Sequence, residues 1–121
     1  MTNKIENVKI DGTFLGINDH GLFDAWLYLS GNGWGVGFGG FALDAPIKKD
    51  GKFLRREDTD GTVGEYIRRI LQTVGVEKWE DLPGKFIRVE SEGLGGGVKK
   101  IGNLLREEWF NPSAWFEGRG A

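Results

Sequence analysis

The sequence predicts an α+β domain: a twisted antiparallel sheet, or a partly open β-barrel, packed by one main amphipathic helix. Three observations carry this prediction. Short alternating apolar and polar runs occur in both halves of the chain, one helical pattern lies between them, and 21 glycines accompany 5 tryptophans in 121 residues. Disordered chains are poor in aromatic residues, so the glycines indicate tight turns and close backbone packing.

The N-terminal part of the chain reads as two strands joined by a turn. The segment 5–17 alternates, but Gly12 and Gly16 interrupt it, which predicts a bulged first strand. The turn "NDHG" then leads into a second strand, 22–30. Its aliphatic side chains fall on one face, and the opposite face carries Asp24, Trp26 and Tyr28.

The next stretch, "GNGWGVGFGG" at 31–40, predicts a hairpin and a third strand that runs to about Asp44. Asn-Gly favours a type I′ turn. Glycines then line one face of the strand, and Trp34, Val36 and Phe38 line the other. A bare strand face indicates the close approach of another group. That group is either a neighbour packed on a coiled sheet, a flat ligand, or a second subunit.

The clearest element is a helix over 63–74. Thr62 and Glu65 have the spacing of a capping box, and Gly75 suits the C-cap. Apolar residues recur at helical spacing, so one face is expected on a core. The polar segment 45–61 before the helix reads as a loop with at most a small hairpin.

The C-terminal part predicts further strands and a short final helix. A strand covers 85–92, and the glycine-rich stretch 93–97 connects it to a closing strand within 98–110, where a partial helix is the alternative. Asn111 is expected to cap a helix that begins at Pro112. Because no repeat or linker interrupts the chain, residues 1–121 are predicted to form a single domain.

Composition argues against several function classes. The chain has no cysteine and one histidine, so thiolate chemistry is excluded and a histidine-based metal site is not expected. The serines lack a nucleophile elbow, and the match to G-x-G-x-x-G at 35–40 is followed by no helix, unlike a dinucleotide fingerprint. We therefore predict no catalysis, metal or cofactor.

Residues 1–30 contain no long apolar run, so a cytoplasmic protein without membrane contact is expected.

The remaining features favour binding of a small phosphate-containing ligand. A net charge of −2 argues against general nucleic-acid binding but allows a local anion site. Arginine grips phosphate bidentately and aromatic rings stack on bases. We predict a hydrogen bond from His20, stacking by Trp34 and Phe38, and phosphate contacts from Arg55, Arg56, Arg68 and Arg88. The structural alternatives are a solvated turn histidine, core aromatics and a charged helix surface.

The segments "TFLGINDHG", "GFGGFALD", "GVEKWEDLPGKFIRVE" and "IGNLL…WFNP" together resemble a family of small, mostly uncharacterised proteins of tailed bacteriophages. The resemblance covers Ile5 to Pro112. Relatives tend to read Gln-Gly-Phe-Gly-Gly-Tyr where this chain has Val36 to Phe41, so a role for that glutamine or tyrosine is not carried over.

The resemblance implies a viral protein that acts in the host cytoplasm. By analogy, phage immune-signal sponges of the Thoeris anti-defence type are homo-oligomers that bind cyclic nucleotide or ADP-ribose-derived signals without cleaving them. The leading interpretation is a counter-defence protein of this kind. Two alternatives stay open: an inhibitor that binds a host defence enzyme through its helix and the Trp109, Phe110 and Trp115 cluster, and an OB-like accessory protein for single-stranded nucleic acid.

Overall fold

A computed structural model describes residues 4–92 and 97–120. Six antiparallel strands form one sheet in the order β3-β2-β1-β6-β7-β8, and β4 and β5 form a separate two-stranded sheet. The six are β1 (Lys4–Ile17), β2 (Phe23–Gly31), β3 (Trp34–Gly39), β6 (Phe86–Ser91), β7 (Val98–Gly102) and β8 (Trp109–Phe110). The α+β prediction is confirmed, and the sheet does not close into a barrel.

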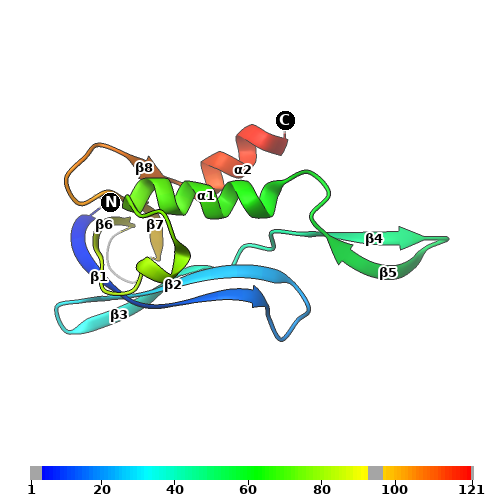
Figure 1. The fold of residues 1–121 in the computed structure, drawn as a ribbon, viewed down its shortest axis with the longest axis horizontal. Coiled ribbons are helices and arrows are strands. Elements are labelled where there is room, and N and C mark those ends of the chain that lie inside the picture. Colours follow the sequence, from blue (N-terminus) through cyan, green and yellow to red (C-terminus); the bar gives the residue numbers. More distant parts are fainter. Residues whose placement is uncertain (1–3, 93–96, 121) are drawn as a thin grey trace.

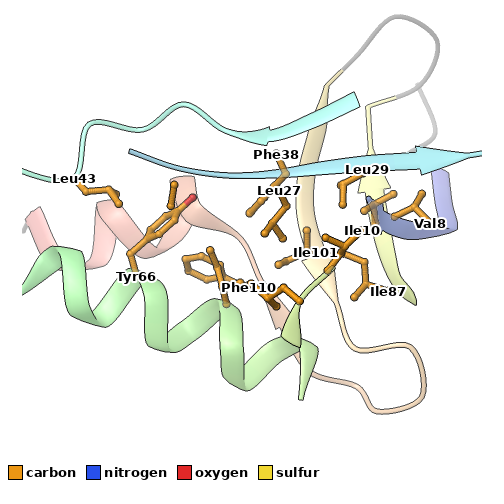
Figure 2. Close-up of a cluster of buried hydrophobic side chains, with 14 residues drawn as sticks. Val8, Ile10, Leu27, Leu29, Phe38, Leu43, Tyr66, Ile87, Ile101 and Phe110 are labelled. Atoms are coloured by element: carbon orange, nitrogen blue, oxygen red, sulfur yellow. The ribbon is translucent and has the colours of Figure 1, made fainter. Parts of the chain in front are cut away.

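Two helices, α1 (Thr62–Val74) and α2 (Pro112–Gly120), lie together on one side of the sheet, and a short 3₁₀ turn, η1 (Trp79–Asp81), follows α1 (Figure 1). Alternating residues of the strands, including Ile10, Leu27, Ile87 and Ile101, are buried on that side. They pack with Tyr66 and Ile70 of α1 in a single core (Figure 2). We call this side of the sheet the core face and the opposite side the outer face.

The predicted third strand is shorter than expected. It ends at Gly39 rather than near Asp44, because Gly39 and Gly40 have φ angles of 149° and 87° that break the extended run. The hairpin before it is confirmed by the pairing of Gly31 with Trp34. Its turn is not type I′, because Gly33 has a φ of 80° while Asn32 has no positive φ.

The polar segment 45–61 forms a distinct hairpin of β4 (Ala45–Lys49) and β5 (Lys52–Glu57), which we call the arm. It extends well away from the rest of the molecule (Figure 1). Its turn is the one that has type I′ character, because Asp50 and Gly51 have φ angles of 52° and 74°. The Asp-Gly pair is therefore the local sequence signal for this hairpin.

Helix α1 ends as predicted but begins differently. The Gly75 N–H donates to Leu71 O, with Gly75 at a φ of 93°. At the other end the expected capping box does not form, because Thr62 is the first helical residue and Gly61 is the N-cap. The carboxylate of Asp60 accepts from the N–H and hydroxyl of Thr62 instead. These bonds lower the pKa of Asp60 below its ordinary value.

The C-terminal region resolves the sequence ambiguity in favour of strands. Segment 98–110 contains β7 and β8 joined by a loop, and the predicted final helix is present with Asn111 Oδ1 accepting from Ala114 N. Of the connection expected at 93–97, residues 93–96 lie outside the described residues. No helix among the described residues is long and apolar enough to cross a membrane.

Candidate functional site

The outer face of the sheet carries a hollow of about 310 Å³ beside the turn between β1 and β2. Its walls combine aromatic rings, two carboxylates and the single histidine of the chain. The residues that line it are Phe14, Ile17, Asn18, Asp19, His20, Asp24, Trp26 and Tyr28. None of the described lysines and arginines lines it.

Strand alternation explains the aromatic walls. Ala25, Leu27 and Leu29 of β2 point into the core, so Asp24, Trp26 and Tyr28 share the outer face. The pairing register sets Phe14 of β1 directly opposite Trp26. Tyr28 remains 47% exposed, which leaves its ring available to a ligand.

The glycines of β3 accommodate the Trp26 indole. Gly37 and Gly39 pair with Tyr28 and Trp26 on the adjacent strand. A Cβ at Gly37 would lie 2.8 Å from Trp26 Cζ3, and one at Gly40 would lie 3.0 Å from Trp26 Cζ2. Of the alternatives for the bare glycine face, the close approach of a neighbour is therefore the one observed, and that neighbour is itself a wall of the hollow.

The Asp24 carboxylate lies at the hollow and binds three groups around it through hydrogen bonds. The side chain is buried, and it accepts hydrogen bonds from Trp26 Nε1 (2.6 Å), Asn18 Nδ2 (3.3 Å) and Gly40 N (3.2 Å). All three donors are neutral, and no ion pair to Asp24 occurs within the described residues. A carboxylate held in this way fixes the indole and also offers acceptor capacity to a ligand.

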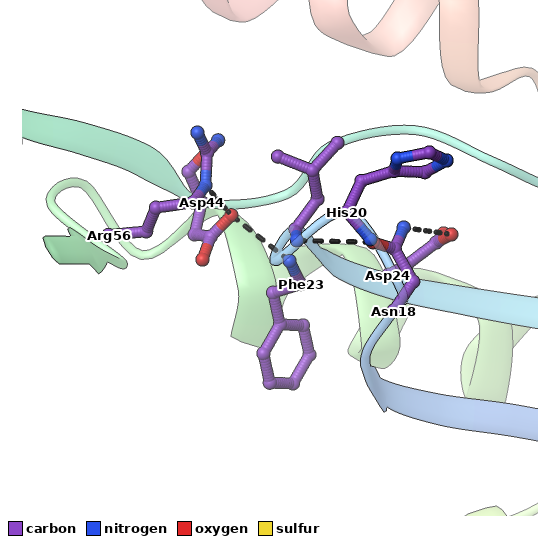
Figure 3. Close-up of polar contacts among 7 residues, drawn as sticks. Asn18, His20, Phe23, Asp24, Asp44 and Arg56 are labelled. Carbon is purple, nitrogen blue, oxygen red and sulfur yellow. Dashed lines mark hydrogen bonds and ion pairs between the residues drawn. The ribbon is translucent and has the colours of Figure 1, made fainter.

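The turn that carries His20 is ordered by Asn18. The Asn18 Oδ1 accepts from His20 N (2.9 Å) and Leu22 N (3.2 Å), as in an Asx-type turn. The His20 side chain is exposed and is one of the residues that line the hollow. Figure 3 shows it beside Asn18 and Asp24. In the described part of the chain its imidazole makes no hydrogen bond, so both ring nitrogens are available to a ligand.

A second carboxylate joins this end of the sheet to the base of the arm. Asp44 Oδ1 accepts from Phe23 N (3.1 Å) and Arg56 Nε (2.8 Å), and Asp44 O accepts from Arg56 Nη2 (Figure 3). Burial opposes ionisation of Asp44, but these hydrogen bonds and the Arg56 charge outweigh it and lower the pKa of the carboxyl. Asp44 therefore ties the start of β2 to the base of the arm.

The seven residues predicted to bind ligand do not form one cluster. His20 lines the hollow and Arg56 lies at the nearby base of the arm. Phe38 is a core residue, 3% exposed, so its ring is not open to a ligand, whereas Trp34 is partly buried against the same core. Arg55 lies further along the arm in an exposed pair with Glu57.

The other two predicted arginines lie elsewhere. Arg88 donates to Asn103 O (2.8 Å) and Arg106 O (2.7 Å), contacts Glu107 and lies over the Trp109 ring. It holds the loop between β7 and β8, and its donors are already engaged. Arg68 lines a shallow groove of about 400 Å³ on α1 and makes no ion pair within the described residues.

The sequence places Asp24, Trp26 and Tyr28 on one strand face, and the rings of Trp26 and Tyr28 are of a type that stacks on bases, but the predicted site used Trp34 and Phe38 instead and left Asp24 out. The signal was present, since a carboxylate alternated with two aromatics opposite an aliphatic face. The described residues contain no group of three or more histidine, aspartate or glutamate side chains placed to hold a metal ion. Comparisons with protein-family models, curated proteins and solved structures found no match to this chain.

Proposed function

We propose that this protein binds a small phosphate-containing nucleotide signal, either a cyclic nucleotide or an ADP-ribose derivative, and sequesters it unchanged. In this proposal it is a phage-encoded counter-defence protein that works as a homo-oligomer. Two independent lines support it: the resemblance of its sequence segments to tailed-phage proteins, and the chemistry of the hollow.

The observation that carries the proposal is the combination of ring faces and hydrogen-bonding groups in one hollow. Phe14, Trp26 and Tyr28 offer surfaces on which a base can stack. Asp19 and Asp24 can accept hydrogen bonds from ribose hydroxyls, as acidic residues do in dinucleotide sites. His20 can donate or accept at the rim.

The same chemistry favours binding over turnover. A general acid or base works best beside a positioned partner, and the imidazole of His20 has none within the described residues. Asp24 is held in place by three donors. For the protein-inhibitor alternative, Phe110 is buried and contributes no open surface, whereas Trp109 and Trp115 are half-buried.

The test is a titration of the purified protein with cyclic di-AMP, cyclic tri-AMP and cyclic ADP-ribose, followed by tryptophan fluorescence. We expect submicromolar binding of one class, quenching that depends on Trp26, and recovery of the intact ligand after heating. Tyr28→Ala and His20→Ala are expected to weaken binding at least tenfold. Phe86→Ala is the matched control, because Phe86 is an aromatic residue of similar exposure, 57%, that does not line the hollow.

Three results would contradict the proposal in different ways. A ligand recovered in altered form would make the protein an enzyme. Equal loss of binding in Tyr28→Ala and Phe86→Ala, or no binding across the three ligands, would remove the hollow as a nucleotide site.

A further inference from the structure

The arm has no packing partner of its own. An isolated two-stranded hairpin is marginally stable in water. No other helix or strand among the described residues packs extensively against β4 or β5, and the arm projects freely (Figure 1). It nevertheless exposes two large apolar side chains, Phe53 (58% exposed) and Leu54 (53% exposed). Such a surface is typical of a segment that is covered by another chain.

The direction of the arm is fixed at its base. Arg56 and Asp44 form an ion pair in which the side chains are only 17% and 9% exposed. Arg56 also donates to the backbone carbonyl of Asp44, and the Asp44 carboxylate accepts from Phe23 N at the start of β2. The arm is thus presented by the sheet in a defined direction rather than attached by a loose loop.

The arm is basic and the rest of the chain is acidic. Residues 45–57 contain five basic and two acidic residues, a net charge of +3, and since the whole chain carries −2, the remainder carries −5. At the tip Lys49 pairs directly with Lys52 across the strands, and neither has an ion-pair partner within the described residues. Like charges opposite each other destabilise a hairpin, so this pair indicates an anionic partner outside the arm.

Among the described residues, the arm tip has cations without an anionic partner, and the hollow has carboxylates without a cationic one. The hollow contains Asp19 and Asp24 but no lysine or arginine of the part of the chain that the structure describes, although a phosphate-containing ligand needs cationic contacts. The base of one arm lies beside its own hollow, because Phe23 bonds Asp44 and directly precedes Asp24. If two arms lie antiparallel across a two-fold axis, the tip of each reaches the base of the other, and hence the other hollow.

We propose that two copies of this chain associate through their arms, and that each arm carries Lys49 and Lys52 to the hollow of the other copy. Phe53 and Leu54 are buried in this contact. The exposed Arg55–Glu57 pair is weak enough to exchange partners. The inference rests on the function proposed for the hollow, because it states how that site acquires its phosphate contacts.

The first test is the mass of the particle in solution by light scattering or sedimentation. We expect the wild-type protein to be a dimer or a multiple of it, and Phe53→Asp to shift it to a monomer at micromolar concentration. Leu105→Asp is the matched control, because Leu105 is 89% exposed in the loop after β7 and lies outside the arm. A circular dichroism spectrum and a melting curve establish that Phe53→Asp is folded. A monomeric wild-type protein overturns the inference.

The second test uses the absence of native cysteine. Separately purified Lys52→Cys and His20→Cys proteins are mixed and oxidised, and a disulfide between the two chains is expected because the tip of one arm reaches the other hollow. The control mixture is Lys52→Cys with Leu105→Cys, which is expected to remain uncoupled. Equal coupling in both mixtures overturns the proposed arrangement.

Cyclic ADP-ribose as the probe then separates this inference from the proposed function. Lys49→Ala/Lys52→Ala is expected to remain dimeric and to lose at least tenfold in affinity. If the dimers cross-link but bind none of the three nucleotides, the association through the arms is supported and the nucleotide function is rejected. If a monomer binds cyclic ADP-ribose with wild-type stoichiometry, the nucleotide function is supported and the association through the arms is rejected.

Discussion

Two groups of aromatic side chains lie on opposite sides of the same sheet, and only one of them is centred on a fully buried ring. On the core face Tyr66 is fully buried and contacts Phe41, Phe110, Trp115 and Phe116. On the outer face the rings of Phe14, Trp26 and Tyr28 surround a hollow. Both groups consist of the same residue types, so the difference arises from the two helices, which cover one face and leave the other open.

The largest expected difference between the two groups is in stability. Tyr66→Ala would leave a cavity among four rings and should lower the free energy of unfolding by about 3–5 kcal/mol. Tyr28→Ala removes a ring that is 47% exposed and should cost less than about 1 kcal/mol. Urea denaturation of both variants measures this, and similar losses would contradict the distinction between the faces.

The variant Tyr66→Phe tests the contribution of the Tyr66 hydroxyl to stability separately from that of the ring. The Tyr66 hydroxyl is buried without a hydrogen-bond partner among the described residues, and burial together with the charge of Asp24 raises its pKa. A buried unpaired hydroxyl carries a desolvation cost. We therefore expect Tyr66→Phe to be at least as stable as the wild-type protein in the same denaturation experiment.

A second prediction concerns the glycines beneath Trp26. A methyl group at Gly37 would meet the indole, whose Nε1 is held by Asp24, so the ring cannot move away without losing that bond. Gly37→Ala should cost about 1–3 kcal/mol and shift the tryptophan emission. Gly35→Ala is the matched control on the same strand, because its new Cβ would lie 3.5 Å from Leu29 O, an ordinary contact. Equal effects at both positions would argue that the strand, rather than the indole, requires glycine.

The arginines give a third contrast. Arg88→Ala removes hydrogen bonds to two backbone carbonyls in the loop between β7 and β8 and should cost about 1–3 kcal/mol. Arg69 is exposed on α1, and Arg69→Ala should change stability by less than about 0.5 kcal/mol. Melting temperatures report the difference. A neutral Arg88→Ala would return that arginine to the candidates for ligand binding.

The smallest effect is expected in acid, at the base of the arm. The pKa of Asp44 is lowered from 3.8, so its ionised form stabilises the fold fully above that pH. As the pH falls below 3.8 the unfolded chain takes up a proton before the folded one, and this stabilisation is lost. Asp44→Asn should therefore flatten this part of the stability profile. Asp50→Asn, at the tip of the arm, is the control and should leave the stability profile unchanged. Urea denaturation of both variants between pH 2 and 6 measures the difference.

Much of the fold could be predicted because its signals are local. Alternation in 5–17 and 22–30 produces β1 and β2, helical spacing produces α1, and Gly75 ends that helix as expected. The short third strand and the missing capping box were not predicted correctly. Each depended on the conformation of one glycine, Gly39 or Gly61, that local spacing does not specify.

The candidate site could be predicted only in part. The sequence identified His20 and placed Asp24, Trp26 and Tyr28 on a common face, because side chains of a strand alternate. It could not assign Phe38 to the core or Arg88 to a loop, because both depend on contacts with residues distant along the chain. The arginines predicted to act together are separated for the same reason.

By itself the sequence determined the strand faces, the helix and the absence of cysteine chemistry, since each follows from neighbouring residues or from composition. Only the tertiary structure decided which sheet face the helices cover, where Trp26 lies on the glycines of β3, and in which direction the arm projects. These depend on register and on long-range contacts such as the pair between Arg56 and Asp44. Such contacts join residues that are far apart along the chain, and the periodicity of the sequence does not predict which distant residues meet.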